Sequence, residues 1–116
     1  MPANQTDGAE IVREAYDLIV GPRQDDYSHP AEDYERTARI FNAITGQHLT
    51  TEAAILFMVA VKLSRLQHEI NADQWLPDNT RDAIGYLGCL HMARTYDRDW
   101  LAQINFKLEN PPETGV

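Results

Sequence analysis

The longest apolar stretch of the chain runs from Thr51 to Glu69, and its hydrophobic positions do not keep to one side of a helix. They cover nearly the whole circumference, which predicts a central and mostly buried helix. Two cations, Lys62 and Arg65, lie inside this stretch, three residues apart and therefore on one face. Because an unpaired buried charge is costly, we expect both to have acidic partners. The apolar positions are Ile55, Leu56, Phe57, Met58, Val59, Val61, Leu63 and Leu66.

Amphipathic stretches with helix-stop signals flank this central helix. Gly21 with Pro22 ends the first stretch, Pro30 and Gly46 bound the second, and Pro77 precedes the last. We expect helices over 9–20, 31–45, 51–69 and 80–97, while 97–110 either extends the last helix or forms a fifth. Gly85 and Gly88 lie inside a predicted helix, which indicates that something approaches its backbone closely there. The flanking side chains expected to face inward are Ile11, Ala15, Leu18, Ile19, Tyr34, Ala38, Phe41, Ala43, Ile44, Thr45, Ile84, Leu87, Leu90, Met92, Trp100, Leu101, Ile104 and Phe106.

The fold class follows from the helical periodicity of the apolar positions. No alternating segment bounded by hairpin turns is present, so the sequence predicts an all-α antiparallel bundle of four to five helices with short loops. At 116 residues the chain is expected to be one domain over 1–116, with flexible ends at 1–5 and 109–116. The single cysteine, Cys89, rules out an intrachain disulfide, and its apolar helical context favours a buried structural thiol.

The charge balance narrows the classes of partner. A formal net charge of -8 argues against nonspecific binding to nucleic acid or to an anionic membrane. No hydrophobic stretch reaches the roughly 18 uncharged residues that a membrane span needs, and the polar N-terminus is no signal peptide. We therefore expect an intracellular, cytoplasmic protein.

Three carboxylates could carry metal chemistry. Glu32 and Glu35 are neighbours on one face of the second predicted helix, and Asp82 lies in the first turn of the fourth. Together they could hold Mg²⁺, which takes carboxylate oxygens along with phosphates and water. Alternatively, Glu35 and Asp82 are the counter-charges of Lys62 and Arg65 in a buried ion-pair network. Both alternatives stay open at this point, and the two are compatible.

Side chains before the second helix and in the fourth could contact a nucleotide. Arg23 could grip a phosphate bidentately, while Tyr27 and Tyr86 could stack on a base or simply pack against the bundle. The four histidines show no close ligand spacing, which makes zinc improbable. The sequence also contains no pattern typical of a catalytic triad or of a Gly-rich phosphate loop.

An ordered set of motifs resembles a family of small phage-encoded all-α domains of unknown function. Members typically show a YG-x-P turn, an N-F-E-R helix start, an M-x-x-x-K-x-x-R-L helix and a D-x-x-G-Y helix. The chain matches with the segments 27–30, 33–36, 58–66 and 82–86, although Ser28 stands where the glycine is usual and Asp33-Tyr34 replaces Asn-Phe. This family is similar, more distantly, to MazG-type nucleotide pyrophosphohydrolases, which bind magnesium through an E-x-x-E and an E-x-x-D pair. Glu32 and Glu35 match the first pair, and the second is missing.

The resemblance implies an intracellular phage protein, in the cytoplasm of the bacterial host, that binds a nucleotide or related phosphorylated small molecule. In that hypothesis Lys62 and Arg65 hold phosphate, and Arg23, Tyr27 and Tyr86 line the ligand. Glu32, Glu35 and Asp82 position magnesium, which would activate water if the protein is a pyrophosphohydrolase. The alternative is a non-enzymatic interaction protein that binds a host or phage protein. Under either hypothesis we expect a homo-oligomer, most simply a dimer.

Overall fold

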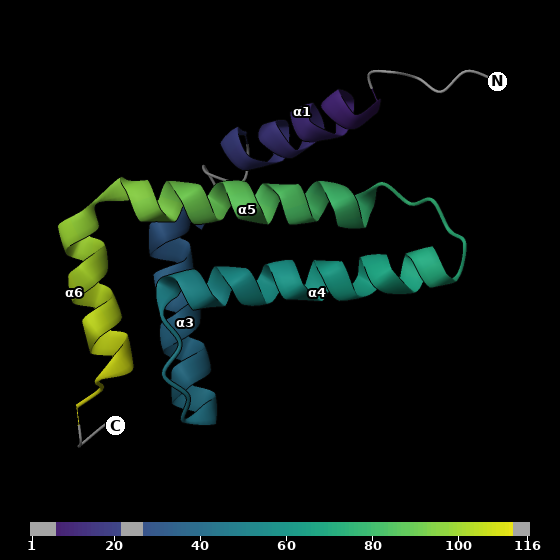
Figure 1. Ribbon diagram of the computed structural model, residues 1–116. Coiled ribbons are helices and arrows are strands. Elements are labelled where there is room, and N and C mark those ends of the chain that lie inside the picture. The colour runs from purple at the N-terminus through teal and green to yellow at the C-terminus, as the bar shows by residue number, and fades with distance from the viewer. Residues whose placement is uncertain (1–6, 22–26, 113–116) are drawn as a thin grey trace.

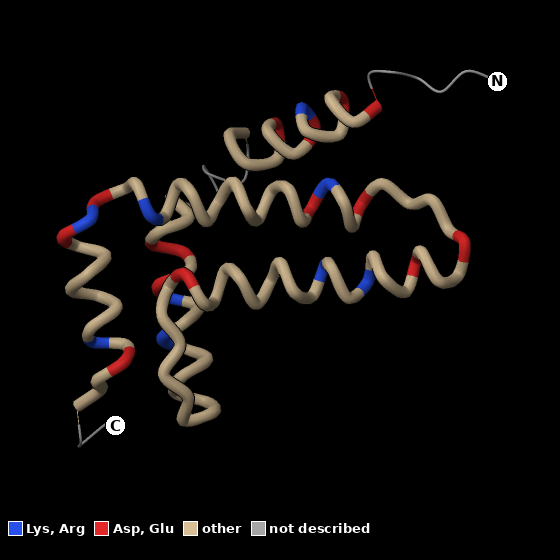
Figure 2. The backbone as a smooth tube through the Cα atoms, viewed as in Figure 1, with Lys and Arg blue, Asp and Glu red and all other residues tan. Residues whose placement is uncertain are grey.

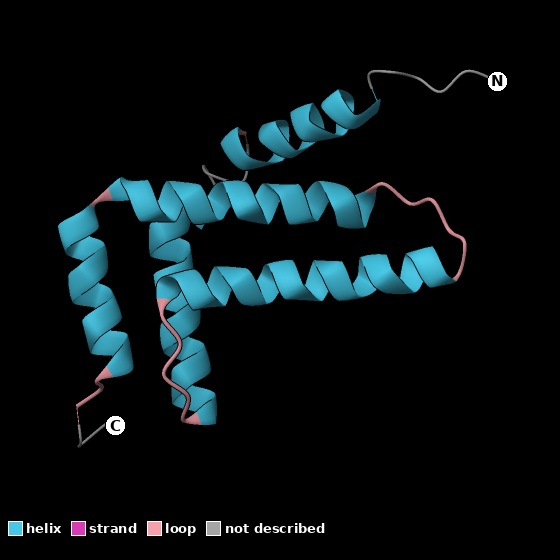
Figure 3. Ribbon diagram, in the orientation of Figure 1, coloured by secondary structure: helices cyan, strands magenta, loops and turns pink. Residues whose placement is uncertain are grey.

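The computed structural model describes residues 7–21 and 27–112. Within these ranges the chain forms helices α1 (Asp7–Val20), α3 (Pro30–Thr45), α4 (Thr51–Asn71), α5 (Asp78–Tyr96) and α6 (Arg98–Glu109), and no strand (Figure 3). The prediction of an all-α fold built from packed helices is therefore confirmed. Arg23, the predicted flexible segment 1–5 and residues 113–116 of the predicted flexible tail lie outside the described ranges.

The α4–α5 hairpin is the centre of the arrangement. α4 and α5 run antiparallel and have the most extensive contact of any two described helices (Figure 1). α3 and α6 run across one end of this hairpin, and α1 lies along the outer side of α5. The antiparallel relation expected for the whole bundle thus holds for α4 and α5, while α3 and α6 cross them steeply.

Local capping interactions explain where the helices begin and end. The Thr50 hydroxyl accepts a hydrogen bond from the Ala53 amide at 3.2 Å, so Thr50 is the N-cap of the central helix α4. Gly46 ends α3 in the left-handed region, with φ of 74°. Asp97 is extended, ends α5, and caps the next helix by accepting from the Trp100 amide at 3.0 Å. Residues 98–109 are therefore a separate helix and not an extension of α5.

The core where α3, α4, α5 and α6 meet is built largely from small side chains. Alanines allow the helix backbones to approach closely, and a few larger side chains fill the remaining space. Cys89 is buried here, as expected of a structural thiol. The buried residues of this cluster are Ala31, Tyr34, Ala38, Ala54, Ile55, Cys89, Ala93 and Leu108.

Close approach to a helical glycine occurs at only one of the two predicted positions. A Cβ added to Gly88 would lie 2.8 Å from Cδ1 of Ile19, because α1 packs directly on that part of α5. A Cβ added to Gly85 would meet nothing within 4 Å. The expectation is therefore confirmed for Gly88 and wrong for Gly85.

The central helix is not buried all round. Leu56, Phe57 and Leu63 are about half exposed, because α4 packs against α3, α5 and α6 along one side and leaves the other side open. The prediction of a mostly buried central helix is therefore wrong. Similarly, α3 extends past α4 and α6 touches the hairpin with only one side (Figure 1). The other side chains predicted to face inward but found exposed are Leu18, Ala43, Ile44, Thr45, Leu87 and Phe106.

Candidate functional site

Lys62 reaches from α4 to α5 and pairs with Asp82. Its Nζ lies 3.0 Å from Oδ2 of Asp82, and its side chain is 14% exposed. The other oxygen of Asp82 lies 3.5 Å from Nε of Arg81. The predicted acidic partner of the central-helix cation is thus confirmed for Lys62, and Asp82 balances two cations at once.

This pair belongs to a row of polar side chains along the hairpin, which we call the polar seam: Glu69, Asn79, Lys62, Asp82 and Tyr86. Toward the α4–α5 connection, Asn79 donates to Glu69 at 3.3 Å. At the other end, Tyr86 meets the buried Tyr34 of α3 edge to face, with ring centroids 6.4 Å apart. The seam therefore contains Lys62 and Tyr86 of the predicted ligand-binding residues and Asp82 of the predicted magnesium ligands, and it joins Lys62 to Asp82 directly.

The remaining predicted residues lie elsewhere. Glu35 accepts a hydrogen bond from Arg39 at 3.2 Å on the side of α3 that faces α6, and not from Lys62 or Arg65. Glu32 is exposed in the first turn of α3. Arg65 is exposed as well, so the prediction that it is a buried cation in need of an acidic partner is wrong.

The predicted magnesium ligands do not form one cluster. In the ranges 7–21 and 27–112, no group of three or more His, Cys, Asp or Glu side chains lies close enough together to hold a metal ion. Glu32, Glu35 and Asp82 thus do not fit a shared Mg²⁺ within one chain. No reaction step through magnesium follows from this geometry.

The turn before α3 contains Ser28 and His29, to which the sequence patterns gave no functional role. Ser28 takes a left-handed backbone conformation, with φ of 66°. This is the position at which the resembling phage domains have glycine, the residue that adopts such a φ without strain. Tyr27, predicted to close over a ligand, precedes this turn and is exposed.

His29 is the N-cap of α3. Its Nδ1 accepts a hydrogen bond from the Ala31 amide at 3.0 Å, which satisfies one of the free amides of the first turn. Its ring stacks on Tyr96 with centroids 4.2 Å apart, and Tyr96 in turn meets Trp100 edge to face. Sequence alone does not favour this role, because Ser, Thr, Asp and Asn are the usual caps.

Burial lowers the pKa of His29 below its ordinary value of 6.5, and the nearby Glu32 carboxylate offsets part of that effect by favouring the charged ring. The neutral ring is also the form that can accept the capping hydrogen bond at Nδ1. The start of α3 is therefore linked to the protonation state of this histidine.

An exposed apolar face is the second candidate site. It occupies the side of α3 and α4 that points away from α5, and includes an open groove of about 730 Å³ beside the 45–50 segment. The Phe41 and Phe57 rings lie 6.2 Å apart in this groove. We define the apolar face as Phe41, Ile44, Ala53, Leu56, Phe57, Ala60 and Leu63.

The charged side chain at the edge of this face is turned away from it. Glu52 pairs with Arg94 of α5 at 3.1 Å and accepts from Asn105 of α6 at 2.9 Å. Asn105 also accepts from the Thr51 amide at 3.0 Å. This network ties α6 to the first turn of α4.

Comparison with known proteins identifies the family. Residues 10–94 match the model of a domain of unknown function, DUF6378. The chain belongs to this family. It is also 28% identical over 80 residues to the Gene 55 protein of Mycobacterium phage D29, a match that covers 69% of this chain and 50% of that protein. The chain thus spans about half the length of this curated phage relative. No solved structure shows significant similarity to the present chain.

The family match confirms the coarser part of the sequence interpretation, a phage-associated all-α domain of unknown function. A relation to MazG-type enzymes receives no support from these comparisons. None of the helices in the described ranges is long and apolar enough to cross a membrane.

We expect Ser28→Gly to stabilise the protein by about 1 kcal/mol, because glycine adopts the positive φ without the clash of a side chain. Ser64→Gly, in the exposed middle of α4, is the matched control and should destabilise by about 0.5 kcal/mol, since glycine weakens helix interiors. Urea unfolding of both variants measures the difference. A loss of stability in Ser28→Gly would contradict the assigned turn strain.

We expect His29 to make the protein less stable in mild acid. Because the folded-state pKa is below 6.5, the unfolded chain takes up the proton more readily. The contribution of His29 is fully present above about pH 6.5 and is lost as the pH falls from there through the lowered pKa.

The control is His29→Asn, which keeps an acceptor at the N-cap and does not titrate. The free energy of unfolding, measured by urea titration between pH 7.5 and 5, should fall less in this variant than in the wild type. Parallel curves for the two proteins would show that His29 has no part in the pH dependence.

Proposed function

We propose that this chain is a non-enzymatic helical interaction protein of phage origin that binds another protein chain through the apolar face. The observation that carries this proposal is a long exposed surface without charge in a chain whose charged residues are otherwise spread along the sequence. From Ile40 to Val61 the sequence has a single charged residue, Glu52, although about a quarter of the whole chain is charged. Figure 2 displays this gap as a tan run over the second half of α3 and the first half of α4.

This nearly charge-free run is relevant to binding because several of its apolar side chains are exposed. Ile44 is 78% exposed, and Leu56, Phe57 and Leu63 are each about half exposed on the neighbouring helix. Contiguous exposed apolar side chains, unlike scattered ones, usually mark a contact with a protein or another ligand. Since Glu52 is held by Arg94 and Asn105 on the other side of α4, a partner that covers this face need not desolvate a charge.

Our first test of the proposal uses immobilised wild-type protein as bait in a lysate of phage-infected host cells. We expect a protein captured at about one-to-one stoichiometry by the wild type and lost with Ile44→Glu, because a glutamate would bring an unpaired charge into the contact. Binding of the purified captured protein, measured by calorimetry, should weaken at least tenfold, or about 1.4 kcal/mol.

The control bait is Val12→Glu, which places the same charge on an exposed apolar position of α1, far from the apolar face. It should capture the same protein as the wild type. Equal capture by all three baits, or a wild type that is monomeric in solution and captures no protein that binds after purification, would count against the proposal.

A second candidate function is binding of a nucleotide or a related phosphorylated small molecule at the polar seam. It is favoured by the Lys62–Asp82 pair, with Tyr86 one helical turn from Asp82 on α5, because these residues belong to the motifs that resemble the phage domains. A phosphate would compete with the Asp82 carboxylate for the Lys62 ammonium. Arg65 would add charge from the next turn of α4, and Tyr27 would stack on a base. Because the three carboxylates are separated within the chain, this candidate is binding without magnesium-dependent hydrolysis.

For this candidate we expect titration calorimetry with a panel of nucleoside mono-, di- and triphosphates, with and without Mg²⁺, to detect binding that Lys62→Met weakens at least tenfold. Arg36→Met, an exposed cation on α3, is the control and should leave binding unchanged. Lys62→Met should also lower the free energy of unfolding by about 1–3 kcal/mol, because it leaves a partly buried carboxylate with less compensation. No binding heat and no change of Tm with any nucleotide would exclude the candidate.

A further inference from the structure

We propose that the occupant of the apolar face is a second copy of this chain. In this arrangement α4 packs antiparallel against α4 of the second copy, around a two-fold axis that passes near Leu63. The inference rests on the proposed function, because it names the partner of the same face. Its support comes from the spacing, charge, shape and area of the described surface.

The spacing of the exposed side chains on α4 suits a helix partner. Leu56, Leu63 and Ile70 are exposed and follow one another at intervals of seven residues. A seven-residue interval keeps side chains on one line along a helix, as in helices that pack side by side. The line is symmetric about Leu63. Two antiparallel copies would therefore place Leu63 against itself and Leu56 against Ile70 of the other copy.

The absence of acidic side chains on this side of α4 also permits contact with a second copy. Two chains that each carry a net charge of -8 repel one another, so a self-contact must use a surface without acidic groups. The exposed side of α4 from Ala53 to Asn71 meets this condition. The residues near the Leu56–Leu63 line are uncharged: Ala53, Leu56, Phe57, Ala60, Leu63, Ser64, Gln67, Ile70 and Asn71. The exposed Arg65 and His68 lie farther around the helix, and neither is acidic.

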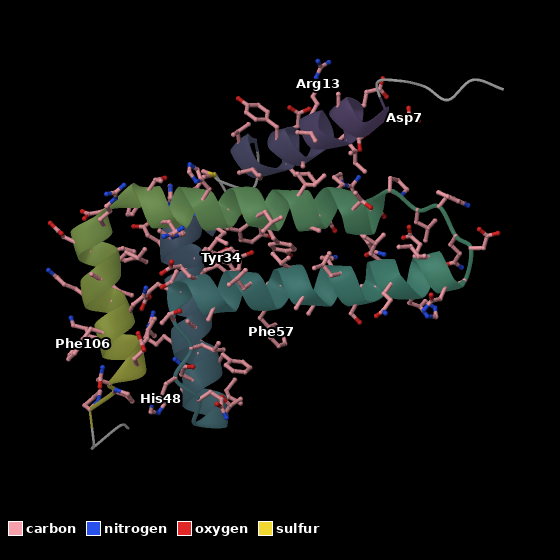
Figure 4. The ribbon with its side chains drawn as sticks, in the orientation of Figure 1. Asp7, Arg13, Tyr34, His48, Phe57 and Phe106 are labelled. Atoms are coloured by element: carbon pink, nitrogen blue, oxygen red, sulfur yellow. The ribbon has the colours of Figure 1, made fainter. Side chains whose placement is uncertain are left out.

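The shape of α3 provides space for one additional helix. The buried residues of α3 end at Ala38, and the seven residues from Arg39 to Thr45 extend beyond α4 on the side away from α5 (Figure 1). At 1.5 Å per residue this extension is about 10 Å long. Packed helices have axes about 8–10 Å apart, so a helix laid under α4 would lie beside this extension of α3. Figure 4 shows Phe57 pointing into the same space.

The surface area allows such an interface. The accessible surface of the chain is 8274 Å², whereas a compact monomer of this mass has about 6,400 Å². This surplus, which includes the chain ends, exceeds the roughly 800 Å² per partner that a stable interface of standard size buries.

The antiparallel arrangement also accounts for the most exposed aromatic side chain. Trp75, in the α4–α5 connection, is 89% exposed. Since α4 of the second copy would run in the opposite direction, its C-terminal end would reach the extension of α3. There Trp75 of the second copy would contact Ile44 and Phe41.

Light scattering coupled to size-exclusion chromatography of the purified full chain tests the inference. We expect a mass of twice 13.2 kDa for the wild type, and a monomer for Leu63→Glu, because two glutamates would meet at the axis. Val12→Glu is the matched control, since Val12 and Leu63 are both 52% exposed, and it should remain a dimer. Mixing Leu63→Glu with Leu63→Lys should restore the dimer. A monomeric wild type, or a dimer unaffected by Leu63→Glu, would overturn the inference.

Cysteine cross-linking tests the alignment of the two α4 helices without variants that could destabilise the fold. Under mild oxidation Leu63→Cys should form a disulfide-linked dimer by itself, whereas Leu56→Cys should cross-link only when mixed with Ile70→Cys. The native Cys89 is buried and does not compete. Cross-linking of Leu56→Cys with itself would indicate a parallel arrangement and contradict the proposal.

The failure of this inference is distinguishable from failure of the proposed function. A monomeric wild type that still captures a protein from lysate in an Ile44-dependent manner would leave the interaction function in place and exclude the second copy as its occupant. A monomer that captures nothing would contradict both.

Discussion

The ion pair between Lys62 and Asp82 fixes how α4 lies against α5, and the other helices are placed by that hairpin. A lysine held 14% exposed between two helices has few alternative positions, because any slip of the hairpin would separate it from its carboxylate. The hydrogen bond that Asn79 donates to Glu69 fixes the same register closer to the α4–α5 connection. Apolar contacts alone would tolerate such a slip more easily. The polar seam therefore supplies specificity to a core made mainly of alanines.

The sequence predicted the helices well because their ends are encoded locally. Thr50, Gly46 and Pro30 act through the hydrogen bonds and dihedral angles of their own turn, which does not depend on distant neighbours. The pairing of Lys62 with Asp82 was also predictable, since a cation in an apolar helix needs an acid from a neighbouring one.

Burial and site assembly were predicted less well, because they depend on where neighbouring helices stop. Leu63 and Ile44 have the periodicity of core residues, yet no described helix covers them. The helical period places Glu32 and Glu35 on the same side of α3, but it cannot tell that Glu35 turns toward α6 and Asp82 toward Lys62. Similarly, the left-handed φ of Ser28 and the cap made by His29 arise from a turn whose shape the sequence did not suggest.

Of the described helices, α1 packs against α5 alone. Its contact includes the close approach of Ile19 to Gly88, and several of its large apolar side chains, such as Val12 and Tyr16, remain exposed. Local unfolding costs least where few buried contacts must be broken. α1 contacts one helix and buries a single side chain, Ala15, so it can separate from the hairpin without breaking the contacts among α3, α4, α5 and α6. Such an opening would uncover the Gly88 side of α5 while the polar seam and the apolar face stay folded.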